Sequence, residues 1–175
     1  KAIFYLKKKM EKRIVEIFDF QYKFNPAIQK HPKLVQRYWM YANSVHLIDY
    51  FNIFCRGSLV SIDYKKRWDE KKMDSVIVKL RFSSGDIGKY NCYWNKNGKW
   101  KIFIKQKKNK YIFQPLEKLR IKNSSKKYKD VKLNLIKEKK FKPGLYQQAN
   151  EIYLMLNKKN FYLSSVEESF KTIKL

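Results

Sequence analysis

The sequence contains few of the residues on which most non-globular chains and most metal sites depend. It has only 5 Gly, 4 Pro, 2 Cys and 2 His among its 175 residues. So little Gly and Pro excludes collagen-like and low-complexity classes. The cysteines, Cys55 and Cys92, cannot form a disulfide framework or a cysteine zinc site, and their apolar surroundings predict buried free thiols. With two histidines a multi-histidine metal centre is excluded, so no metal is expected.

Several common motifs are also missing. The sequence contains no Gly-x-Gly-x-x-Gly, P-loop, Cys-x-x-Cys, His-Glu-x-x-His or Gly-x-Ser-x-Gly segment, so no nucleotide cofactor is expected to bind this chain. Nothing approaches the roughly 18 apolar residues of a membrane-spanning helix, and the N-terminal residues do not form a signal peptide. We therefore expect no membrane association and a cytoplasmic location.

Acidic residues are scarce beside basic ones. There are 15 Asp and Glu against 41 Lys and Arg, which gives a formal charge of +26, yet only six of the basic residues are arginine. Base readout and bidentate phosphate binding depend on arginine, and the lysines are spread along the chain. The charge therefore favours a solvated surface with weak, non-specific affinity for nucleic acid. A dedicated basic nucleic-acid-binding module stays open as an alternative.

The hydrophobic content of 44% indicates a packed globular unit, and we expect a single domain over residues 1–175. Residues 13–24 alternate as one long strand, with Ile14, Phe18, Phe20, Tyr22 and Phe24 on one face and Asp19, Gln21 and Lys23 on the other. Strand-like runs at 75–82, 87–94 and 99–105 are separated by turn residues and predict an antiparallel meander. A short strand is expected at 111–113, and a surface loop at 118–140.

Helices are expected at three places. The first begins at Asn43 or Ser44 as the capping residue and runs to Gly57. The second follows Pro143-Gly144, with a stripe at helical spacing that we expect to face the core: Leu145, Ala149, Ile152, Tyr153 and Leu156. The third begins with a capping box formed by Ser165 and Glu168. Together these elements predict an α+β fold, a mainly antiparallel open sheet of about five or six strands with helices on one face.

The first helix is apolar almost all round and is predicted to be buried. His46 and Asp49 lie three residues apart on it, so they share a face and need partners or a cleft. Spacing alone leaves two interpretations open. His46 is either a satisfied core histidine with Asp49 as a structural anchor, or a member of a functional site.

Segments at both ends of the sequence resemble a known family. The run from Trp39 to Tyr50 is similar to the segment that opens the first long helix in the second domain of Gfo/Idh/MocA-type oxidoreductases. Residues 141–151 and 165–173 resemble the C-terminal helices of that family. The resemblance implies the C-terminal, substrate-binding and oligomerisation domain of an NAD(P)-dependent enzyme that acts on a sugar, nucleotide-sugar or related polyol. The family's Rossmann domain has no counterpart here and the chain begins at Lys1, so a fragment of a longer enzyme is expected.

The resemblance assigns the catalytic acid/base role to His46. Many members carry an Asp four residues before this histidine, where this chain has Ala42; Asp49 matches an Asp that commonly follows the histidine by three. Further substrate-binding candidates lie between the first strand and the helix: Asn25, Arg37, Trp39, Tyr41 and Asn43. Tyr146 and Gln147 are weaker candidates.

Two other expectations follow. In the resembled family the open sheet face forms the subunit interface, and alternating aromatic residues predict a homo-oligomer through that face, among them Phe18, Phe20, Tyr22, Trp94 and Trp100. The missing acidic partner at Ala42 keeps a non-catalytic structural homolog open as an alternative.

Overall fold

A computed structural model describes residues 12–22, 25–69, 71–72, 74–123, 127–132, 141 and 144–173. The chain divides into two compact units, residues 1–131 and 132–175. The larger unit contains the sheet and the helices that carry the candidate site. The smaller unit contains the two C-terminal helices. The single-domain assignment stays a prediction.

The sheet has eight strands in the described residues, in the order β2-β3-β4-β1-β5-β6-β7-β8. Their bounds are β1 (Arg13–Phe20), β2 (Leu59–Lys66), β3 (Ser75–Phe82), β4 (Ile87–Tyr93), β5 (Lys101–Gln106), β6 (Asn109–Phe113), β7 (Leu119–Lys122) and β8 (Lys129–Asp130). All neighbours are antiparallel except β1 and β4. The α+β class is confirmed, and the sheet is larger than the predicted five or six strands.

The predicted meander is wrong in one respect. The runs at 75–82, 87–94 and 99–105 do form strands, but β1 lies between β4 and β5 and pairs with β4 in parallel. Because β4 and β5 follow each other closely in the sequence, we expected them to pair directly. Instead the N-terminal strand β1 lies between them in the sheet. The segment predicted as a surface loop holds β7 and β8, while residues 124–126 and 133–140 lie outside the described residues.

One face of the sheet carries the core. Val15 and Ile17 are fully buried on β1 and lie beside Gly88 and Tyr90 on β4 and Ile104 and Ile102 on β5. The alternation predicted for the first strand is present in β1, and the buried face is the one that carries Val15, Ile17 and Asp19. Phe18 and Phe20 are only half-buried on the opposite face, while Asp19 is fully buried on the core face. Large aromatics are a poor guide to the core here because each face of the strand carries apolar side chains.

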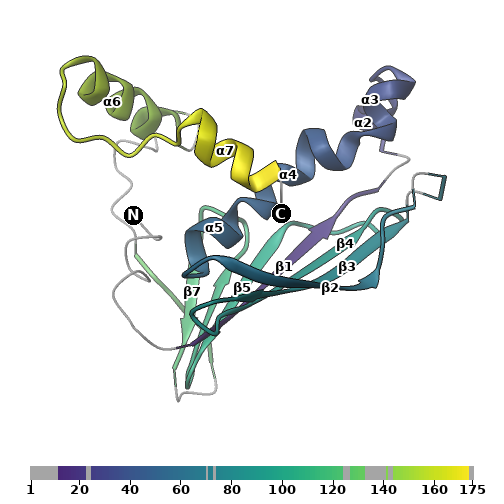
Figure 1. Cartoon of the computed structure of the whole chain (residues 1–175), viewed down its shortest axis with the longest axis horizontal. Coiled ribbons are helices and arrows are strands. Elements are labelled where there is room, and N and C mark those ends of the chain that lie inside the picture. The colour runs from purple at the N-terminus through teal and green to yellow at the C-terminus, as the bar shows by residue number, and fades with distance from the viewer. Residues whose placement is uncertain are drawn as a thin grey trace. The chain divides into compact units, whose positions relative to one another are not determined.

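Short helical segments cover the core face (Figure 1). They are α2 (Pro26–Gln29), α3 (Lys33–Arg37), the π-helix η1 (Met40–Ser44), α4 (Val45–Ile48) and α5 (Tyr50–Phe54). Phe51 contacts the sheet at Gly88, where an added Cβ would lie 2.8 Å from the Phe51 ring. The Phe54 ring lies 5.5 Å from that of Phe113. Gly88 therefore allows the helix to approach the sheet closely, and helices on one face of this unit are confirmed.

The second unit contains α6 (Leu145–Leu156) and α7 (Val166–Ile173). The predicted capping box is confirmed, because Glu168 N donates to Ser165 Oγ and Ser165 N donates to Glu168 Oε2, each at 3.1 Å. The stripe on α6 was expected to face the core, but Leu145, Ile152, Tyr153 and Leu156 are between 41% and 73% exposed. No helix in the described ranges is long and apolar enough to cross a membrane.

Candidate functional site

The candidate site lies on an almost continuous helical segment from Lys33 to Phe54. The segment widens into a π-helical turn at Met40–Ser44, immediately before His46. Asn43 and Ser44 were predicted to cap a helix that begins there. They instead lie inside this turn, and neither caps α4 with its side chain. π-Turns inside helices are frequent at functional sites because the extra residue changes which side chains share a face.

His46 lies on the outer side of this segment. Its side chain is exposed, whereas Leu47, Phe51 and Phe54 are buried against the sheet. The prediction of a helix buried all round is therefore wrong, because apolar residues on one side cover the sheet and His46 lies among the residues that remain accessible. A core-histidine role is excluded, and an accessible imidazole can hold or release a proton.

The remaining predicted residues have different surroundings. Asp49 is half-buried and its Oδ1 accepts a hydrogen bond from Asn52 Nδ2 at 3.3 Å. Asn25 Oδ1 accepts from Ala27 N at 2.9 Å, so this side chain caps α2. Asn43 is half-buried on the π-turn. The hydrogen bond gives Asn25 a structural role, whereas Asn43 and Asp49 each lie three residues from His46 along the helical segment.

The predicted aromatic residues form two groups. Trp39 is half-buried, and its ring lies 5.0 Å from that of His31. Tyr41 is 55% exposed and lies beside Tyr38, with ring centroids 6.2 Å apart, while the Arg37 guanidinium carbon lies 5.6 Å from the Tyr38 ring centroid. The structure therefore brings Arg37 and Tyr41 together through Tyr38 on the accessible side of the segment. An exposed aromatic face of this kind suits the apolar face of a sugar.

The weaker candidates lie in the second unit. Gln147 Nε2 donates to Glu151 Oε1 at 2.6 Å, and the Tyr146 ring stacks 6.2 Å from that of Phe141. Glu151 Oε2 also accepts from Tyr162 N at 2.7 Å. These contacts tie the segment after α6 back to the helix, which is a structural role.

A buried polar cluster lies where β1 ends, and the sequence interpretation missed it. Asp19 is fully buried, and its carboxylate accepts hydrogen bonds from Tyr90 OH at 2.7 Å and Gln21 Nε2 at 2.8 Å. Burial raises the pKa of the Tyr90 hydroxyl well above its usual value, and the adjacent Cys92 and Asp19 add to the rise. The hydroxyl therefore stays protonated as a donor. The available signal in the sequence was that Asp19 shares one face of the strand with Val15 and Ile17.

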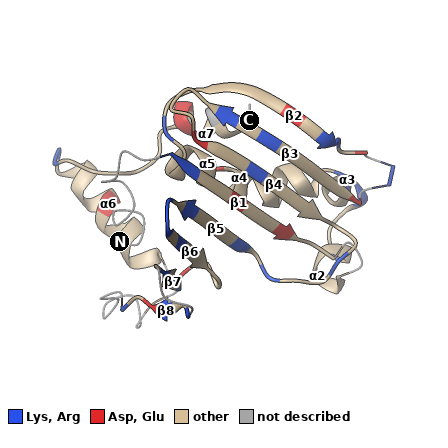
Figure 2. Cartoon of the chain, turned by 90° about the horizontal axis from the view of Figure 1, so that it is seen from below, with Lys and Arg blue, Asp and Glu red and all other residues tan. Residues whose placement is uncertain are grey.

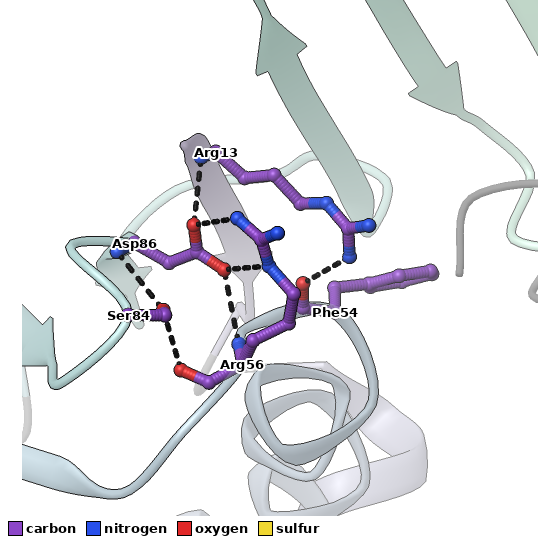
Figure 3. A network of polar contacts seen from close by, with 5 residues as sticks. All are labelled: Arg13, Phe54, Arg56, Ser84 and Asp86. Atoms are coloured by element: carbon purple, nitrogen blue, oxygen red, sulfur yellow. Dashed lines mark hydrogen bonds and ion pairs between the residues drawn. The ribbon is translucent and has the colours of Figure 1, made fainter. Parts of the chain in front are cut away.

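A second buried network fixes the end of α5 (Figure 3). Asp86 is fully buried and accepts from Arg13 N at 2.8 Å and from Arg56 N at 3.0 Å, while Arg13 Nη1 donates to Phe54 O at 3.0 Å. Burial alone would raise the pKa of Asp86, but the hydrogen bonds from Arg56 and Arg13 outweigh it and lower the pKa. The network joins the helical segment to β1 and to the β3–β4 turn.

Neither cysteine has the environment of a reactive thiol. Cys55 and Cys92 are buried and free, as predicted. Burial raises the pKa of Cys55 to about 12 and raises that of Cys92 as well, so both stay protonated and unreactive near neutral pH. Within the described parts of the chain, no three His, Cys, Asp or Glu side chains gather as a metal site.

Comparison with solved structures finds a similar fold in parts of several dehydrogenases. Levoglucosan dehydrogenase in complex with NADH and L-sorbose matches with a TM-score of 0.70 and 12% identity, over 98% of this chain and 56% of that chain. UDP-N-acetylglucosamine 3-dehydrogenase GnnA from Acidithiobacillus ferrooxidans matches with a TM-score of 0.70 and 11% identity, over 99% and 56%. The dehydrogenase MviM from Clostridium difficile matches with a TM-score of 0.69 and 16% identity, over 98% and 55%.

No family model matches the sequence, and no curated protein matches it. The resemblance to Gfo/Idh/MocA-type oxidoreductases is confirmed at the level of the fold, since the matched structures are dehydrogenases of this type. The chain spans about half the length of each of them. It has the fold of one part of these enzymes, with no more than 16% sequence identity in these three comparisons.

Proposed function

We propose that this chain is the C-terminal, substrate-binding and oligomerisation domain of an NAD(P)-dependent oxidoreductase that acts on a sugar, nucleotide-sugar or related polyol. The observation that carries the proposal is the match of almost the whole chain to about half of dehydrogenases that were solved with NADH and sugars. The accessible position of His46 on the helix that follows a π-turn supports it. Free buried thiols agree with a cytoplasmic location.

The described residues do not fit a dinucleotide. The chain has no Gly-rich turn between a strand and a helix that would receive a pyrophosphate. In the complete enzyme the nicotinamide would exchange hydride with the substrate carbon, and that cofactor belongs to a domain outside these residues. We assign to this chain the binding of the substrate and the movement of a proton.

Within that division, His46 holds or releases the proton of the reacting hydroxyl. Its accessible imidazole suits general acid/base chemistry. Ala42 supplies no carboxylate one turn earlier, so Asp49 and Asn43 are the polar groups nearest along the helix. Tyr41 and Trp39 offer aromatic faces, and Arg37 a charged group, to the rest of a sugar-like substrate.

Exposed apolar residues on the same helices support the packing of another domain against them. Leu34 is 67% exposed, Tyr41 55% and Tyr38 40%. A contiguous apolar strip of this kind is uncommon on the solvent-exposed surface of a monomeric protein. We infer that the cofactor domain covers it and thereby closes the site around His46.

Self-association through the open sheet face belongs to the same proposal. That face carries half-buried Ile14, Phe18, Phe20, Tyr93 and Phe103. Two residues of the expected aromatic set are not available to it, because Trp94 is fully buried and packs against Trp68, and Tyr22 lies beyond the end of β1. The stacked rings of Phe18, Phe20 and Tyr93 remain as its apolar centre.

The two histidines allow a direct test on this chain. Imidazole resonances of His46 and His31 are followed by NMR while levoglucosan, L-sorbose or UDP-N-acetylglucosamine is added. We expect a saturable shift of the His46 resonance with at least one of these probes, and His31→Gln serves as the assignment control. Saturable binding that leaves the His46 resonance unmoved would place the substrate elsewhere and contradict the proposed role.

A further inference from the structure

A fully buried carboxylate near the end of β1 has only uncharged side chains as its hydrogen-bond donors. Figure 2 shows β1 between β4 and β5, with acidic residues in red. Asp19 is completely buried, and Tyr90 OH and Gln21 Nε2 donate to it. Within the described parts of the chain, no lysine or arginine forms an ion pair with it. Burying a carboxylate without a cation costs stability, so packing alone gives no reason for an acidic residue here.

A second fully buried carboxylate in the same unit has different surroundings. Asp86 pairs with the Arg56 guanidinium at 2.8 Å and accepts a hydrogen bond from Arg13 N at 2.8 Å. Its burial is explained by the ion pair and by the connection that it makes between α5 and the sheet. Asp19 has no such cation, and its donor from the neighbouring strand is the Tyr90 hydroxyl. The role of Asp19 therefore depends on what Tyr90 contacts.

The Tyr90 hydroxyl links this carboxylate to the π-turn η1. Ser44 lies in that turn and is completely buried. Burial is the largest influence on the pKa of Tyr90 and raises it, whereas the Ser44 hydroxyl, as a donor to the Tyr90 oxygen, acts in the opposite direction. The two hydroxyls lie outside strict hydrogen-bond geometry, and Ser44 Oγ has no further partner among the described residues. Tyr90 is thus the polar group of the sheet that Ser44 faces.

Ser44 occupies a position that controls the start of α4. It lies two residues before His46, and α4 packs against β1. Ser44 and Leu47 are both completely buried on the sheet side, while His46 is exposed. An apolar contact such as that of Leu47 has no preferred direction, whereas a contact between hydroxyl groups does. The polar contact at Ser44 therefore restricts how the turn can rotate on the sheet.

We propose that Ser44 and Tyr90, oriented by Asp19, are positioning residues of the proposed site. Their contacts fix the π-turn on the sheet and thereby fix the place of the His46 imidazole. This inference rests on the function proposed above, because the position of His46 matters only if it handles a substrate proton. In such a site a displacement of about 1 Å can cost about 10²-fold in rate. Accurate placement accounts for a buried carboxylate that packing does not require.

Ser44→Ala tests the helical end of this chain of contacts without any substrate. The variant removes one hydroxyl and leaves Asp19 and Tyr90 in place. NMR follows the imidazole resonances of His46 and the hydrogen exchange of the Asp49 amide, which donates to Val45 O at 3.0 Å in the first turn of α4. We expect the His46 resonances to move and the Asp49 amide to exchange at least about tenfold faster. Ser75→Ala, at another buried serine in this unit, is the control and should change neither.

Two further variants test the sheet end. Tyr90→Phe should move the His46 resonances as Ser44→Ala does, whereas Tyr111→Phe, at another buried tyrosine on the core face, should leave them in place. Asp19→Asn keeps an acceptor for the Tyr90 hydroxyl, so its His46 resonances should stay close to those of the parent. Because Ser44→Ala leaves the carboxylate and its donors intact, it decides the matter even where Tyr90→Phe does not fold.

Two results would overturn the positioning role. One is a Ser44→Ala variant in which the His46 resonances and the exchange of the Asp49 amide match those of the parent. The other is an equal change in the serine or tyrosine controls, because that would reflect a general loss of stability. Failure of the proposed function is distinguishable from both, since it would appear in the parent as the absence of any sugar-dependent shift of the His46 resonance.

Discussion

Arg56 grips Asp86 through two side-chain hydrogen bonds, from Nε at 2.9 Å and from Nη2 at 2.8 Å, while its backbone N–H donates a third to the same carboxylate. The pair links the residue that follows α5 to the turn between β3 and β4. Ser84 completes the connection, because its hydroxyl donates to Arg56 O at 2.6 Å and accepts from Asp86 N at 3.2 Å. The position of the helical segment that carries His46 thus depends on a carboxylate in a distant turn.

Asp86→Asn should lower the free energy of unfolding by about 3 kcal/mol or more, because it leaves Arg13 and Arg56 without the charge that compensates them. The loss is measured by urea denaturation at neutral pH. Ser83→Ala, in the same turn, is the matched control and should cost less, because Ser83 Oγ accepts from Ser58 N and Ser58 Oγ at the surface. Equal losses in the two variants would contradict the anchoring role.

Because of the same Asp86 carboxylate, we expect the protein to lose stability at low pH. The folded-state pKa of Asp86 is lowered, so its contribution is present above the unfolded value of about 3.9 and is lost as the pH falls through the lower folded value. The parent should therefore lose stability more steeply than Asp86→Asn below about pH 4. Parallel curves of unfolding free energy against pH would contradict this assignment.

His46→Ala should leave the fold intact, because the residue is exposed. We expect a change in unfolding free energy within about 0.5 kcal/mol. In the complete enzyme, turnover should fall by about 10²-fold or more, with a smaller effect on substrate affinity. Normal turnover with normal stability would exclude a catalytic role.

Asp49→Asn tests whether the Asp49 carboxylate orients His46 or only anchors the helix. An orienting carboxylate would lower turnover and shift its pH profile, whereas a structural anchor would mainly lower the thermal midpoint. Asn52→Ala is the control, since it removes the amide that donates to Asp49 Oδ1 without altering charge. A Tm loss common to both variants, with turnover unchanged, would identify Asp49 as an anchor.

The sequence predicted where strands and helices lie along the chain better than it predicted which strands pair in the sheet. Alternation located β3, β4 and β5, and the box at Ser165 and Glu168 located α7, because both signals are local. The insertion of β1 between β4 and β5 depends on contacts between residues 73 to 93 positions apart along the chain, which no local pattern encodes. The two short strands β7 and β8 lacked a hydrophobic period long enough to detect.

At the candidate site, too, the sequence identified a residue but not its surroundings. Motif similarity selected His46, but the apolar helix suggested burial, whereas the structure exposes the imidazole and buries Leu47 instead. The π-turn could not be predicted, because a single inserted helical residue has no compositional signature. The alternation placed Asp19 opposite Phe18 and Phe20, but it gave no sign that Asp19 is buried, because an acidic residue in an alternating strand ordinarily lies on the wet face.

The chain alone should not bind NADH specifically. It lacks the glycines and the helix N-terminus that hold a pyrophosphate. Because a charge of +26 attracts any anion, the titration is made at raised salt, where screening removes diffuse attraction. Saturable micromolar binding under those conditions would contradict the placement of the cofactor outside this chain.

Self-association should depend on the aromatic residues of the open face. Light scattering at high micromolar concentration is expected to show a dimer or tetramer, and Phe18→Glu should return it towards monomer, because a carboxylate there would be desolvated among the rings of Phe20 and Tyr93. Val60→Glu, at a 66% exposed position on edge strand β2, is the control. A parent that stays monomeric would exclude the assembly role.

The buried contact between Asp19 and Tyr90 should be strongly coupled. Tyr90→Phe removes the hydroxyl that donates to the Asp19 carboxylate beside Gln21 Nε2 and should cost about 1.5–3 kcal/mol. Asp19→Asn keeps an acceptor for Tyr90 and removes the buried charge, so the hydroxyl matters less in that background. We therefore expect the double variant to be more stable than the sum of single losses predicts, by about 1 kcal/mol in a double-mutant cycle. Urea denaturation of the four proteins measures this coupling. Strict additivity would mean that the Tyr90 hydroxyl does not stabilise the Asp19 carboxylate.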